Sequence, residues 1–201
     1  MDADRRVAQA VLDRVFQTER ELSSLFEENF LAIDDVVKCF GEMFVPEDFP
    51  RFESFDFPEP LDDQPRDSFL VFPSPTFLCH HLLAARKELV DLRNLDFEDE
   101  RFLRITGGKP GWLMIRKSNL ARQSRRNGHV PPRGEEFAST STILWAALLY
   151  RLVRGRDLFT EPVYAFHPST LISTVGGTIG IRSVFNIEQG APLASEIVIN
   201  S

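Results

Sequence analysis

The sequence predicts an α+β fold, and three observations support this class. Apolar side chains recur at a helical period over residues 7–40, which predicts a long amphipathic N-terminal helix or a helix pair. Residues 137–153 predict a central buried helix, because their middle, residues 143–150, is apolar almost all the way round. Short apolar runs between Gly and Pro turns over residues 163–199 predict a small, mostly antiparallel sheet. Helices and strands segregated along the chain in this way are typical of α+β proteins, not of doubly wound ones.

The chain has 201 residues, enough to bury a core, and we expect one compact domain overall. Within it we distinguish an N-terminal helical segment (1–44), an acidic strap rich in Pro and Phe (45–68) and an α+β core (69–201).

The N-terminal helical segment is either one helix or two. Thr18 to Glu21 has the pattern of a capping box, which would restart a helix there, and Gly41 is a natural stop. The apolar face of this segment must be buried against the rest of the chain or against a second copy of it.

The acidic strap has five Pro, eight Asp or Glu and four Phe, so no regular element is expected in it. In one interpretation Phe49, Phe52, Phe55 and Phe57 insert into the surface of the core. In another, the strap is an interaction segment that orders only when it meets a basic partner. A third interpretation combines the two, with the strap lying over the protein's own basic region and masking it.

The α+β core is expected to begin with a strand at 68–72. Ser74 and Pro75 are suited to the N-cap and first turn of a helix that runs to Leu92. Residues 102–105 and 112–115 flank a Gly-rich turn and predict an antiparallel hairpin. The central helix over 137–153 should stop at Gly155, and the expected later strands cover 163–166, 178–187 and 196–199.

Charge divides the chain into two halves of opposite sign. Residues 1–100 hold 10 Lys or Arg and 24 Asp or Glu, a net charge of −14, whereas residues 101–201 hold 13 and 6, a net charge of +7. Residues 101–133 contain nine Lys or Arg and no acidic residue. This stretch predicts an anion-binding surface, because guanidinium groups bind phosphate and carboxylate in planar pairs. Its candidate ligands are Arg116, Lys117, Arg122, Arg125, Arg126 and Arg133.

Structural ion pairing is the competing interpretation of the basic stretch, with its Arg side chains neutralised by the acidic half. Glu135 and Glu136 are interpreted as the start of the central helix, where carboxylates are favoured by the helix dipole. Alternatively, one of them would orient His129 as a proton-transfer group. His167, at the end of an expected strand, is the second candidate acid or base.

No intact catalytic or cofactor motif is present in the sequence. GGKPGW at 107–112 lacks the order of a phosphate-binding loop, and VGGTIG at 175–180 is followed by a strand pattern where a dinucleotide fingerprint needs a helix. Cys79, His80 and His81 are neighbours on a predicted helix and point too far apart to share a metal. We therefore expect no cofactor and no metal site.

Two cysteines, Cys39 and Cys79, form no disulfide framework, and no apolar run approaches the length of a membrane helix. These features predict a soluble, cytoplasmic protein that does not engage a membrane.

Our first functional hypothesis is a non-enzymatic binding or adaptor protein, which contacts a protein partner or itself through the N-terminal helical segment or the acidic strap. The alternative is an enzyme acting on an anionic small molecule, with the Arg cluster as clamp and His129 or His167 as acid or base. Nucleic-acid binding through 101–133 is a lower alternative and is not expected. The whole chain is acidic, and Trp112 is the one aromatic side chain of the stretch that looks exposed.

Overall fold

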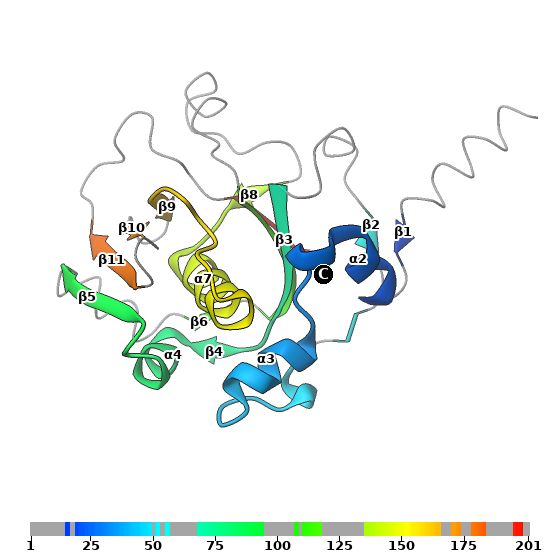
Figure 1. Ribbon diagram of the computed structural model, residues 1–201, viewed down its shortest axis with the longest axis horizontal. Helices are drawn as coiled ribbons and strands as arrows, with labels where there is room; N and C mark the ends of the chain where they lie inside the picture. The colour runs from blue at the N-terminus through cyan, green and yellow to red at the C-terminus, as the bar shows by residue number, and fades with distance from the viewer. Residues whose placement is uncertain are drawn as a thin grey trace, which may run out of the picture.

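Helix α7 (Thr140–Arg154) is largely buried and lies between two four-stranded sheets in a computed structural model of the chain (Figure 1). The structure describes residues 15–16, 19–49, 51–52, 55–56, 68–94, 107–108, 110–117, 135–165, 170–173, 178–183 and 195–198. The predicted α+β class is confirmed over these residues. Among them, no helix is long and apolar enough to cross a membrane.

Helix α7 (Thr140–Arg154) is the predicted central helix, and every residue from 140 to 150 is buried. It begins at Thr140, later than predicted, because Ser139 caps it: the Ser139 hydroxyl accepts a hydrogen bond from the Thr142 amide at 3.2 Å. It ends at Gly155 as predicted, since the backbone there turns into the left-handed region at φ 68°. The indole of Trp145 donates to the Pro73 carbonyl at 3.0 Å and ties the helix to the first sheet.

The sheets are mostly antiparallel, as predicted. The first has the spatial order β3 (Phe69–Ser74), β7 (Gly111–Arg116), β12 (Ser195–Val198), β8 (Glu136–Phe137) and is antiparallel throughout. The second has the order β5 (Val90–Asn94), β11 (Ile179–Ser183), β10 (Thr170–Ser173), β9 (Val163–Ala165), and its β5–β11 pair is parallel. Two short pairs join β4 (Phe77–Leu78) to β6 (Gly107–Gly108) and β1 (Val15–Phe16) to β2 (Phe55–Asp56).

Every residue of β3 and β7 is buried. Since successive side chains of a strand point to opposite sides, both faces of these two strands are covered. One face enters the main core together with α7, and the other forms a second cluster beneath the N-terminal helical segment. Figure 1 shows α2 (Glu19–Phe26) on the side of β3 opposite to α7. The second cluster consists of Leu22, Phe26, Phe30, Phe69, Val71, Trp112 and Met114.

The N-terminal helical segment is a helix pair over its described residues, α2 (Glu19–Phe26) and α3 (Ile33–Phe40). The two are separated by a 3-10 turn, η1 (Glu27–Asn29), and by Phe30, which bridges to Val71 of β3. The Leu31 amide donates to the Val71 carbonyl at 2.9 Å, so pairing with the edge of β3 breaks the helical path. The apolar face packs intramolecularly, because Leu22 and Phe26 are buried against the sheet.

Two expectations for the first 68 residues are corrected. Val15–Phe16 is strand β1, not helix, because it pairs with β2. The acidic strap also holds regular elements, η2 (Pro46–Asp48) and β2. Its Phe49 is buried, and Phe52 meets Trp112 edge-to-face at 5.7 Å, so insertion of Phe is confirmed for these two. The side chain of Phe55, and Phe57, lie outside the described residues.

The helix predicted from Ser74 to Leu92 is wrong in its extent. Ser74 ends β3, where it pairs with Gly111, and helix α4 covers only Cys79–Ala85. Residues 90–94 form β5 because β11 offers them a pairing edge. Here long-range pairing overrides the local capping signal.

Of the hairpin predicted between 102–105 and 112–115, residues 102–105 lie outside the described residues. Residues 113–115 belong to β7 and pair with β3 on one edge and with β12 on the other. Of the strands predicted in the last third, β9, β11 and β12 are present, whereas β10 was not predicted.

Candidate anion-binding site

Two of the six predicted anion ligands, Arg116 and Lys117, belong to the described part of the chain. The other four, Arg122, Arg125, Arg126 and Arg133, lie outside the described residues, as do His129 and His167. The enzymatic and nucleic-acid alternatives depend on those residues and stay predictions.

Arg116 is used inside the protein. Its side chain is 6% exposed and forms two hydrogen bonds with the carboxylate of Glu135, one of them from Nε to Oε2 at 3.3 Å. The guanidinium carbon also lies 4.7 Å from the centre of the Phe69 ring. This pair is an internal ion pair within the basic half. Glu135 therefore does not start the central helix as expected, and neither does Glu136, which belongs to β8.

Lys117 follows β7 and points toward the N-terminal helical segment. Its ammonium group donates to Oδ1 of Asn29 at 2.5 Å and lies 5.8 Å from the centre of the Tyr150 ring. The side chain thus reaches from the basic half of the chain to η1 in the acidic half.

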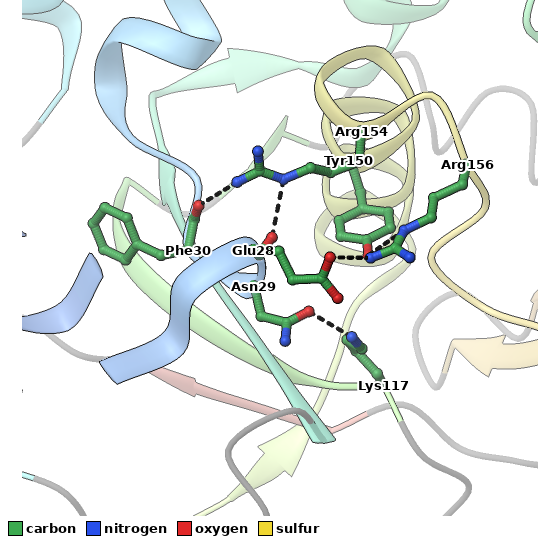
Figure 2. A network of polar contacts seen from close by, with 7 residues as sticks. All are labelled: Glu28, Asn29, Phe30, Lys117, Tyr150, Arg154 and Arg156. Carbon is green, nitrogen blue, oxygen red and sulfur yellow. Dashed lines mark hydrogen bonds and ion pairs between the residues drawn. The ribbon is translucent and has the colours of Figure 1, made fainter. Parts of the chain in front are cut away.

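Two further cations meet η1 beside Lys117, and we call Lys117, Arg154 and Arg156 the cationic junction (Figure 2). Arg154 donates from Nε to the Glu28 carbonyl and from Nη2 to the Phe30 carbonyl, both at 2.9 Å. Arg156 donates from Nε to the Tyr150 hydroxyl at 3.0 Å, and its Nη2 lies 2.7 Å from Oε2 of Glu28. The Glu28 carboxylate therefore contacts Arg156, and the charges of Lys117 and Arg154 also act on it.

The local sequence explains this arrangement. Arg154 is the last residue of α7, and the left-handed turn at Gly155 reverses the chain so that Arg156 returns to Tyr150, one turn back along the helix. The guanidinium of Arg156 lies 5.6 Å from the Tyr150 ring centre. On the other side, the bridge from Phe30 to β3 holds η1 against the junction.

Electrostatics at the junction follow from these contacts. The hydrogen bond and charge of Arg156 lower the pKa of Glu28, and the charges of Lys117 and Arg154 add to that effect. Hydrogen bonds to Glu28 and to Tyr150 raise the pKa of Arg156. The side chains of Arg156 and Glu28 are 53% and 60% exposed, so this ion pair faces water. An external anion can therefore reach the same guanidinium.

Sequence reasoning did not find Arg154, Arg156, Tyr150 or Glu28. They lie outside the basic stretch 101–133, and the one signal for them was the opposite charge of the two halves. Arg154 lies 126 and 124 positions along the sequence from Glu28 and Phe30, whose carbonyls it binds, and local sequence patterns carry no information on contacts at that separation.

Two cysteines and a pair of adjacent histidines are the other candidate groups in the described part of the chain. Burial raises the pKa of the Cys79 thiol to about 12, and burial also raises the pKa of Cys39. The rings of His80 and His81 lie with their centres 4.0 Å apart and are tilted by 55° to each other, and His81 is exposed. In the described part of the chain, no three His, Cys, Asp or Glu side chains come together as a metal site requires. Trp112 is fully buried and does not offer the stacking surface that nucleic-acid binding would use.

Comparison with models of known protein families, with curated proteins and with solved structures found no match.

Proposed function

We propose that this chain is a cytoplasmic, non-enzymatic binding protein that recognises an acidic segment of a partner protein at the cationic junction. The observation that carries the proposal is the state of Arg156. Its guanidinium is half exposed, is held by the Tyr150 hydroxyl, and binds a carboxylate at 2.7 Å. A side chain that already holds one carboxylate is suited to hold another.

Preorganisation supports this function. Arg154 is fixed by two backbone carbonyls, and Arg156 is fixed by a neutral hydroxyl. Their side chains therefore lose little further conformational entropy when a ligand binds. Lys117 also belongs to the basic stretch 101–133, whose excess of positive charge favours an acidic ligand.

The test is binding of a fluorescently labelled octaglutamate peptide, followed by anisotropy. R156Q is expected to weaken binding about tenfold, because it removes a charge-assisted hydrogen-bond donor. R151Q is the matched control, because it removes the same charge from a side chain of α7 that forms its ion pair with Asp157, at 3.1 Å, and not with Glu28. Affinity should also fall as salt rises from about 0.05 to 0.5 M. If R156Q and R151Q lost the same affinity for octaglutamate, net charge alone would explain the binding, and this would contradict the proposal.

A further inference from the structure

We infer that Glu28 is an internal competitor for the cationic junction: its carboxylate occupies the anion site of the free protein, and an acidic partner must displace it. This inference rests on the proposed function and adds the regulation of the same site. At the Glu28–Arg156 contact, a carboxylate from the acidic half of the chain would inhibit a binding site in the basic half.

The Glu28 carboxylate can leave without unfolding the segment that carries it. Its side chain is 60% exposed and, among the described residues, is held by Arg156. The backbone around it is anchored by other groups. Arg154 binds the carbonyls of Glu28 and Phe30, and the Phe30 ring stacks on Trp112 at 5.5 Å with an interplanar angle of 14°. Rotation of one exposed side chain is therefore enough to open the site.

The site stays assembled once the carboxylate has left. Arg156 keeps its hydrogen bond to the Tyr150 hydroxyl, and Arg154 keeps its two carbonyls (Figure 2). These acceptors are neutral, so they position both guanidinium groups without cancelling their charge. The opened junction is thus a preformed receptor for an anion.

Competition of this kind selects for multivalent partners. An exposed ion pair is weak, yet Glu28 is tethered beside Arg156 and acts at a high effective concentration. A ligand with one carboxylate gains too little to replace it. A segment with several carboxylates engages Arg154, Lys117 and Arg156 together and displaces Glu28.

The test compares octaglutamate binding by the wild type, E28Q and E27Q, each as the full chain. E28Q is expected to bind about two- to fivefold more tightly than E27Q, the range set by an exposed ion pair. E27Q is the matched control, since it removes the same charge at the neighbouring position, and the Glu27 carboxylate makes no ion pair with the described residues. E28D, which keeps the charge but shortens the side chain, should bind with intermediate affinity and supplies a second variant if E28Q is unstable.

The outcomes separate the two proposals. If R156Q weakens binding while E28Q and E28D match E27Q and the wild type respectively, Glu28 does not compete and the inference is wrong, although the proposed function stands. If neither the wild type nor E28Q binds octaglutamate saturably, the proposed function itself fails. Binding by E28Q that exceeds binding by E27Q supports both.

Discussion

Arg116 and Glu135 show why a cluster of basic residues in a sequence is not yet a binding surface. Their side chains are 6% and 1% exposed, and each neutralises the other in the interior. Burying two charges costs desolvation energy that their mutual attraction repays only when the pair is complete. The sequence identified Arg116 as a cation but had no means of locating its partner, 19 positions away.

Breaking the Arg116–Glu135 pair should destabilise the protein. E135Q should lower the free energy of unfolding by about 3–5 kcal/mol, because it removes the negative charge from a buried ion pair while Arg116 stays charged. The double substitution R116M/E135L removes both charges and should cost much less. Urea denaturation measures both variants. A double variant as unstable as E135Q would show that the charges themselves are not the source of the loss.

Cys79 gives a second prediction, on reactivity and pH. Burial raises its pKa from 9.0 to about 12, so the thiol stays protonated and should not react with a disulfide reagent at pH 9 in the folded protein. The stabilisation from a neutral Cys79 is fully present below pH 9 and is lost as pH rises from 9 toward 12. Reagent titration with and without urea tests this, and rapid labelling of Cys79 in the native state would contradict it.

Among the elements, the extent of helix α7 followed closely from the sequence, whereas the extent of α4 did not. The α7 signal is local: an apolar run, a capping Ser139 and a stop at Gly155 are all contained in the segment that folds. The region from Ser74 to Asn94 carries helical signals of similar strength, but β7 and β11 recruit its ends as strands. Local patterns failed where a distant strand offered hydrogen bonds.

The two ends of α7 allow a prediction about each. S139A removes the hydroxyl that accepts a hydrogen bond from the Thr142 amide and should lower the free energy of unfolding by about 1 kcal/mol. S139D retains an acceptor at this position and should keep most of that stability. G155A places a side chain at φ 68° and should cost about 1–2 kcal/mol, although its Cβ would meet nothing within 4 Å. Thermal unfolding measures these variants. A neutral G155A would show that the left-handed turn is not needed.

At the scale of the whole molecule, the described parts of the N-terminal helical segment and the core share one packed structure. Phe30 lies over Trp112, and Arg154 and Arg156 hold η1 from the far side. The sequence anticipated attraction between the two halves, but it did not reveal which residues meet. The signs of the charges were readable, whereas their pairing depends on how the sheet brings distant segments together.

Removing the Phe30 ring tests this shared structure. F30A should lower the free energy of unfolding by about 3–5 kcal/mol and shift Trp112 emission to longer wavelength, because water reaches an indole that is now fully buried. L78A is the control, since Leu78 is among the exposed apolar side chains. Unfolding should remain a single transition. Two separate transitions would show that the N-terminal helical segment folds independently of the core.

The position of β12 between β7 and β8 has a consequence for how the protein is made. Residues 195–198 supply a strand inside the first sheet, so that sheet stays incomplete on the ribosome until they have emerged. Until then β7 presents an unpaired edge rich in Trp, Leu, Met and Ile, which is the kind of edge that recruits other chains. Completion of the first sheet therefore waits for the last of its described strands in chain order, and nascent chains that stall before residue 195 are expected to depend on chaperones.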